Sequence, residues 1–184
     1  MLSIQSTEQL TGARISGDFW DLDQLINAIY KVTGDENRYY DYQGARQRIL
    51  GICYNLRHAA QGDHQLEFVS NGLTKSVLTH HEIIFPNKNV YYATEVLWPE
   101  LIFTAIALND FIRLHQELID SSEWNIYIAT IRKFQATVAE CLEQELEDDE
   151  YIALKSQLME AAKTTKKALH EIQINANYPE EILW

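Results

Sequence analysis

The chain has 184 residues, of which 46% are hydrophobic. A chain of this length can bury about two thirds of its unfolded surface in a single core. It contains only seven glycines and three prolines, too few for the many tight turns of an all-β fold, so helices are expected to dominate. The net charge of −12 excludes nonspecific affinity for nucleic acid or anionic lipid, because both require a positive field on the protein.

The cysteines and the N-terminal residues predict a cytoplasmic protein. Cys53 and Cys141 have no zinc-like spacing and fall among apolar helical positions, as buried free thiols do in a reducing compartment. Residues 1–10 lack the basic and apolar regions of a signal peptide, and no window reaches the roughly 18 apolar residues of a membrane span. We therefore expect one soluble domain over residues 1–184, without a membrane partner.

The chain opens with patterns typical of two strands and a helix. Residues 2–6 and 12–17 alternate apolar and polar side chains, which predicts a β-hairpin. A helix is expected next, with either Asp18 or Asp21 as its N-cap and Gly34 as its stop.

Strands and helices then continue to alternate up to residue 98. A second helix is predicted from about Tyr42 to Ala60. Residues 64–70 and 87–98 have strand patterns, and residues 73–85 between them are expected to hold a short helix.

The second half of the chain is predicted to be helical. Pro99 can begin a helix over about residues 99–119, which is apolar on almost every side and should be buried at the centre. Residues 123–145 and 150–172 are expected to form an antiparallel helical hairpin, followed by a strand and a tail. The predicted class is α+β, with a small antiparallel or mixed sheet from residues 1–98 packed against the helices of residues 99–172.

Two arginines of the second predicted helix point toward its apolar face. Arg46 and Arg57 are eleven residues apart, which returns to within about 20° of the same direction. Cys53 and Leu50 share that direction. An arginine on such a face needs a carboxylate or a bound anion, because burying its charge unpaired costs several kcal/mol.

Two interpretations of these arginines stay open. In the first, they extend to water or pair with internal acids such as Asp41, Glu95 or Asp110. In the second, they bind an anionic ligand, and their separation of about 16 Å along the helix fits a nucleotide or a peptide better than a single phosphate.

Other residues could complete such a ligand site. Tyr39, Tyr40 and Tyr42 could supply stacking surfaces. Asn109 and Asp110 lie where the central helix passes from an apolar to a polar stripe, a setting in which pockets open. The candidate ligand-binding residues are Tyr40, Tyr42, Arg46, Arg57, Asn109 and Asp110.

No motif indicates a metal, a cofactor or a known catalytic mechanism. The His-His-Glu run at residues 80–82 cannot easily direct both histidines at one ion, and Glu140, Glu143 and Glu147 lack the companion histidines of a dinuclear site. P-loop, GxGxxG, GxSxG and HExxH sequences are absent. We therefore expect no metal site and no cofactor.

The sequence resembles a family of small uncharacterised bacterial proteins. The similarity lies in the strings SGDFWDLDQL, TGDENRYYDYQGARQRILGICYNLRHAAQGD, NVYYATEVLWPE and FTAIALNDFI. It covers about residues 2–120 and brings no catalytic or binding residues with it.

The favoured function is a noncatalytic binding or regulatory protein of the cytoplasm. Residues 140–150 hold seven acids and no base, which predicts contact with a basic protein partner. The chain could instead associate with a second copy through an apolar stripe of Trp124, Ile128, Ile131, Val138 and Leu142. The alternative is a small-molecule or nucleotide-processing enzyme in which Arg46 and Arg57 orient an anion and Asp110 acts as the base. A third interpretation is a homo-oligomeric structural component.

Overall fold

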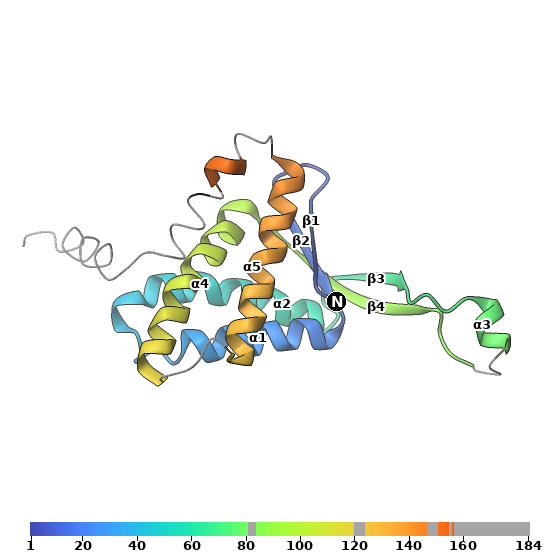
Figure 1. The fold of residues 1–184 in the computed structure, drawn as a ribbon, viewed down its shortest axis with the longest axis horizontal. Coiled ribbons are helices and arrows are strands. Elements are labelled where there is room, and N and C mark those ends of the chain that lie inside the picture. The colour runs from blue at the N-terminus through green and yellow to red at the C-terminus, as the bar shows by residue number, and fades with distance from the viewer. Residues whose placement is uncertain (81–83, 120–123, 147–150, 155, 157–184) are drawn as a thin grey trace, which may run out of the picture.

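Figure 1 shows the fold in a computed structural model, which describes residues 1–80, 84–119, 124–146, 151–154 and 156. In chain order the elements are β1 (Ser3–Ser6), β2 (Gly12–Gly17), α1 (Phe19–Thr33), the 3-10 helix η1 (Tyr40–Tyr42), α2 (Gln43–Ala60), β3 (Gln65–Ser70), α3 (Lys75–His80), β4 (Lys88–Leu97), α4 (Trp98–Ile119) and α5 (Ile126–Glu145). These elements confirm the predicted α+β class and the order of strands and helices.

The four strands form one sheet in the order β1-β2-β4-β3, and every neighbouring pair is antiparallel. The antiparallel alternative of the prediction is thus confirmed over the mixed one. Ile15 of β2 pairs with Ile4 of β1 and with Thr94 of β4, and all three side chains are buried. Because side chains alternate along a strand, these residues define the face of the sheet that packs against the helices.

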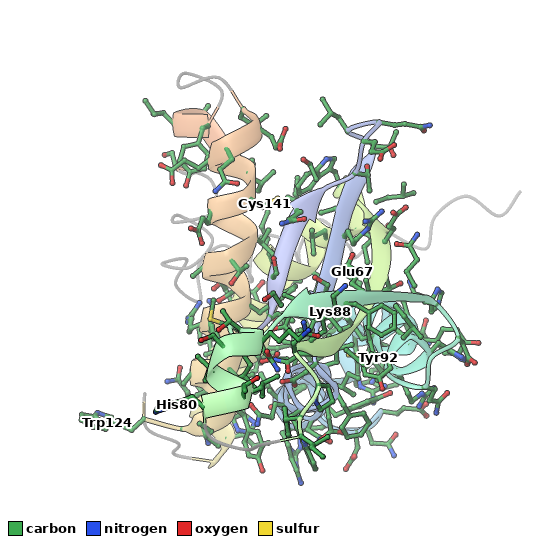
Figure 2. All side chains as sticks on the ribbon, turned by 90° about the vertical axis from the view of Figure 1, so that its right-hand side faces the viewer. Glu67, His80, Lys88, Tyr92, Trp124 and Cys141 are labelled. Atoms are coloured by element: carbon green, nitrogen blue, oxygen red, sulfur yellow. The ribbon has the colours of Figure 1, made fainter. Side chains whose placement is uncertain are left out.

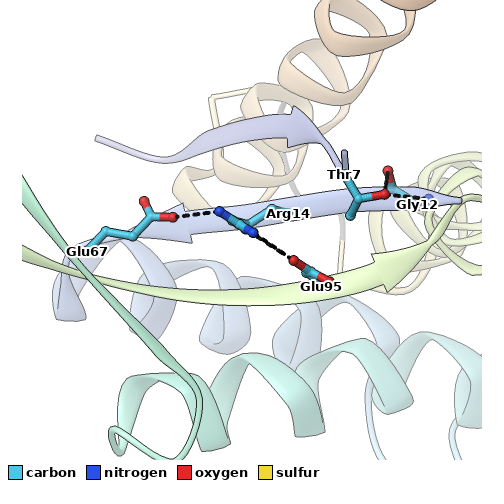
Figure 3. A network of polar contacts seen from close by, with 5 residues as sticks. All are labelled: Thr7, Gly12, Arg14, Glu67 and Glu95. Atoms are coloured by element: carbon cyan, nitrogen blue, oxygen red, sulfur yellow. Dashed lines mark hydrogen bonds and ion pairs between the residues drawn. The ribbon is translucent and has the colours of Figure 1, made fainter. Parts of the chain in front are cut away.

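The opposite face of the sheet carries a network of charged side chains. The Arg14 guanidinium lies between two carboxylates, with Nη2 2.8 Å from Glu95 and Nη1 3.4 Å from Glu67 (Figure 3). This network joins β2, β4 and β3 on the solvent side. Such pairs contribute at most about 1 kcal/mol, so the sheet depends mainly on its buried face.

Helix α1 begins and ends at the residues that the sequence indicates. Asp18 is its N-cap, and its carboxylate accepts a hydrogen bond from the Asp21 N–H at 2.9 Å. The Asp21 carboxylate in turn accepts from the Asp18 N–H at 3.2 Å, so both predicted acids take part in one capping box. Gly34 ends the helix with a positive φ of 64°.

The apolar stripe of α5 is part of the protein's own core. Ile128, Ile131, Val138 and Leu142 are at most 3% exposed, and α5 packs against α1 and β1. The prediction that this stripe binds a second copy is therefore wrong, because α1 and β1 already cover it. Trp124, just before the helix, is 94% exposed.

The remaining predictions have different outcomes. Cys53 and Cys141 are buried free thiols as expected, and burial raises the pKa of Cys53 to about 12. No helix in the described ranges is long and apolar enough to cross a membrane. Residues 151–154 are helical, but most of the second helix of the predicted hairpin and the terminal strand lie outside the described residues.

Replacing Gly34 by alanine is expected to destabilise the protein by about 1–3 kcal/mol, because φ 64° and ψ −170° form a conformation that only glycine adopts readily. The new Cβ would also lie 2.5 Å from Cδ of Arg38. The control is Gly51→Ala in α2, where a new Cβ meets no atom within 4 Å. This substitution should stabilise the protein by about 0.5–1 kcal/mol. Urea unfolding measures both, and equal stability of the two variants would contradict this account.

Candidate functional site

Arg46 is buried, and its guanidinium donates a hydrogen bond to the protein's own backbone. Its Nε donates a hydrogen bond to the carbonyl oxygen of Gly34 at 2.9 Å. Gly34 ends α1, and the last carbonyls of a helix carry a partial negative charge that favours a cation. Arg46 therefore holds the end of α1 against the start of α2.

The predicted carboxylate partners of Arg46 have other roles. Glu95 pairs with Arg14, and Asp110 pairs with Arg113 at 2.8 Å. Within the described part of the chain, no salt bridge joins Arg46 to an acid. The expectation of an internal carboxylate partner is wrong, because a helix C-terminus takes that place.

Arg57 is exposed and does not join Arg46. Its guanidinium carbon lies 5.7 Å from the centroid of the Tyr54 ring, on the surface of the last turn of α2. The helical repeat directs both arginines to a similar side of α2. It does not show which other elements cover that side at different positions along the helix. The prediction that both arginines point into one buried site is wrong for Arg57.

The three tyrosines before α2 do not form a common stacking surface. Tyr39 and Tyr42 pack edge-on against Phe111 of α4, with ring centroids 5.8 Å and 6.2 Å from it. Tyr40 is 81% exposed. Successive residues of a 3-10 helix point about 120° apart, so two of the rings reach the core while the third cannot.

Asn109 and Asp110 diverge because adjacent helical residues are about 100° apart. The Asn109 Oδ1 faces α5, where it accepts hydrogen bonds from Arg132 and, at 3.1 Å, from Gln135. Asp110 lies on the other side beside Tyr42. Burial raises the pKa of Asp110, while Arg113 opposes the shift. Burial and then the charge of Asp110 raise the pKa of Tyr42.

Of the candidate ligand-binding residues, Tyr42 and Asp110 are near enough for the charge of Asp110 to raise the pKa of Tyr42, and the others have separate surroundings. Asp110 is held by Arg113, and Asn109 is held by α5. No group of three His, Cys, Asp or Glu side chains among the described residues could hold a metal ion. His81, Glu82 and Glu147 of the acid and histidine runs lie outside that part of the chain.

Sequence analysis missed a buried histidine on α4. His115 is 5% exposed, and its Nδ1 has no hydrogen-bond partner among the described residues. Burial, followed by the charge of Arg38, lowers the pKa of His115. The hydroxyl of Tyr39 is also buried without a partner there. His115 follows Phe111 by four residues, so its place on the buried stripe of the helix was a signal that could have found it.

Sequence analysis also missed an exposed apolar surface on strands β3 and β4. Leu66 pairs with Tyr92, and Phe68 pairs with Val90. Counting by twos along β4, these four residues lie on the same face of the sheet as buried Thr94. We call Leu66, Phe68, Val90 and Tyr92 the apolar arm face. Leu66 is 49%, Phe68 62% and Val90 40% exposed, whereas Tyr92 still packs partly against the core, so the cover of the helices ends at this point of the face.

The arm itself consists of β3, α3 and residues 88–92 of β4. In Figure 1 it runs out from the body of the protein, with α3 at its tip, and Figure 2 views it end-on with Glu67, His80, Lys88 and Tyr92 labelled. Further apolar side chains near the tip, Val77 and Phe85, are also exposed. The alternation of Leu66 and Phe68 with polar neighbours was visible in the sequence, but nothing there showed that the helices end short of them.

The fold and the arm define an α+β protein with a projecting two-stranded ribbon. Residues 2–149 match the sequence model of a family described as "Domain of unknown function (DUF6904)", and residues 144–184 match it as a second segment. The chain belongs to this family, and the match extends beyond residues 2–120 where the resemblance was seen. No curated protein and no solved structure matches the chain.

Arg46→Ala is expected to destabilise the protein by about 2 kcal/mol, because it removes a charged hydrogen bond at a helix end together with buried packing. Arg57→Ala, the matched control, should change stability by at most about 0.5 kcal/mol because its side chain is exposed. Urea unfolding measures both. Equal effects would mean that the two arginines share one environment, contrary to the structure.

Acidification is expected to destabilise the protein through His115. Its pKa in the folded state is lowered from 6.5, so the unfolded chain binds the proton more readily. The stability is complete above pH 6.5 and falls as the pH drops below that value toward the folded pKa. Asp110, whose pKa is raised from 3.8, contributes with the opposite sign in a more acidic range.

Unfolding in urea at about pH 7.5 and about pH 5.5 tests this dependence. The loss of stability between the two should be smaller in His115→Leu than in the native protein. An unchanged loss in the variant would assign the dependence to other groups.

Proposed function

We propose that the protein is a noncatalytic binding protein of the cytoplasm that engages a protein partner through its arm. The observation that carries the proposal is the apolar arm face, which continues the buried face of the sheet into solvent. Monomeric soluble proteins rarely expose large contiguous apolar patches unless the patch binds something. Strands that leave the body of a fold are suited to this role because a partner can reach both their faces.

The environment of the arginines also supports a noncatalytic role. The alternative enzyme requires Arg46 and Arg57 to hold an anion while Asp110 acts as a base. Arg46 already donates to Gly34, Arg57 is on the surface, and Asp110 is bound by Arg113. Arg46 and Asp110 have structural partners and Arg57 is on the surface. This arrangement favours the noncatalytic proposal over an enzyme that would use the three residues as one site.

The charge of the body directs contact toward the arm. Glu140 and Glu143 are exposed on α5, within the acidic run of residues 140–150. In contrast, residues 65–92 contain two acids, Glu67 and Glu82, and two bases, Lys75 and Lys88, and are neutral overall. The net charge of −12 therefore belongs to the rest of the chain. An acidic protein partner is repelled by the rest of the chain and meets no opposing net charge at the arm.

Site-specific photo-crosslinking in cells tests the proposal. The photoreactive p-benzoylphenylalanine replaces Phe68 on the arm or, as a control, Trp20, which is 66% exposed on α1. We expect one discrete protein adduct, identified by mass spectrometry, from position 68 and none from position 20. Adding Val90→Ser should abolish the adduct. If neither position gives an adduct with any protein, the arm is not a binding surface.

A further inference from the structure

We propose that the arm binds the arm of a second copy of this chain, so that two apolar arm faces pack together across a two-fold axis. This inference rests on the proposed function and names its partner. In such an isologous interface each copy contributes the same surface, so a self-complementary patch is sufficient. The arm face provides one, because Leu66, Phe68 and Val90 are exposed on it and its apolar side chains form two adjacent cross-strand pairs.

The shape of the arm suits face-to-face packing. Leu66 lies opposite Tyr92, and Phe68 lies opposite Val90, so four side chains form two adjacent rows on one face of the ribbon. Stacked sheets pack about 10 Å apart with interdigitating side chains. In the body the helices provide this second layer for the same face of the sheet. A second arm would provide it for Phe68 and Val90.

Charge favours a second copy over a basic partner. A basic protein would be drawn to the residues outside the arm, which together carry the −12 charge, and not to the neutral arm. Two copies of this chain repel each other over most of their surfaces for the same reason. The arms are the place where they can meet without opposing net charges, and their projection from the body keeps the two acidic bodies apart (Figure 1).

The available area fits a modest dimer. An aromatic side chain can bury roughly 150–250 Å², and Phe68 and Phe85 are 62% and 56% exposed. On the arm face itself, Phe68 therefore offers on the order of 100 Å² per chain, to which Leu66 and Val90 add, while Phe85 and Val77 lie nearer the tip. The total from two arm faces lies below about 1,000 Å², in the range of weak and transient interfaces. The dimer should accordingly dissociate on dilution.

The chain's own C-terminal residues are the competing occupant of the arm face. The Glu145 carboxylate accepts a hydrogen bond from Ser6 of β1. The end of α5 therefore lies at the other edge of the sheet from β3. A photo-crosslink from the arm face distinguishes a second arm from the C-terminal residues.

Sedimentation equilibrium of the full chain tests the inference. One chain has a mass of 21.4 kDa, and the native protein at about 100 μM should have twice that mass. Phe68→Ser and Val90→Ser should each shift the protein toward one chain, while Trp20→Ser, on an exposed aromatic outside the arm, should not. Circular dichroism verifies that each variant is folded. A monomeric native protein, or a dimer that persists when residues 68 and 90 are both serine, overturns the proposal.

Disulfide trapping gives a second measurement that does not weaken the surface. The two native cysteines are buried, so a cysteine placed on the arm is the reactive one. Oxidation of Phe68→Cys or Val90→Cys should link two chains, and oxidation of Trp20→Cys should not. Failure of both arm variants to link while Trp20→Cys does would place the contact elsewhere.

The photo-crosslink at position 68 separates this inference from the proposed function. An adduct between two copies supports both, and an adduct with a different protein overturns the dimer while the binding role survives. A crosslink within one chain to residues 157–184 overturns both and assigns the arm face to the C-terminal residues. The absence of any adduct also overturns both.

Discussion

The hydrogen bond from Arg46 to the carbonyl of Gly34 fixes the arrangement on which the helical layer depends. It joins the end of α1 to the first turn of α2, and Gly34 can present its carbonyl there because its backbone has a positive φ. The short connection between these helices then carries Tyr39 and Tyr42 onto Phe111 of α4. One buried cation therefore joins α1 to α2 and borders the connection whose tyrosines contact α4.

Most of the fold was predictable because it follows from local patterns. Alternation gave the strands, the acids at 18 and 21 gave the capped start of α1, and Gly34 gave its end. The site was less predictable for a physical reason. Periodicity assigns a direction to Arg46 and Arg57, but the burial of each depends on which neighbour lies across from it, and that is a tertiary property. The same reason explains Asn109 and Asp110, whose partners come from α5 and from α4 itself.

The exposure of the arm could not be predicted from sequence patterns either. The apolar positions of β3 and β4 look like those of β1 and β2, and alternation alone predicts that all four strands bury one face. The helices, however, reach only part of that face, because the ribbon continues outward beyond them (Figure 1). Conversely, the stripe of α5 looked available for assembly and is covered by α1 and β1. Which apolar surface stays exposed is thus decided by where the layers of the fold end.

The ion pairs of Arg14 lie where the ribbon leaves the body of the sheet. Arg14 and Glu95 belong to strands of the body, while Glu67 belongs to β3, so the longer of the two contacts ties the arm to the sheet it leaves. The contact with Glu95 is exposed and the contact with Glu67 is partly buried, and mobile ions screen surface pairs over about 8 Å at physiological ionic strength. Salt therefore weakens a small electrostatic contribution at the root of the ribbon, whereas the backbone pairing of β3 with β4, a strand that runs from the body into the arm, does not depend on it.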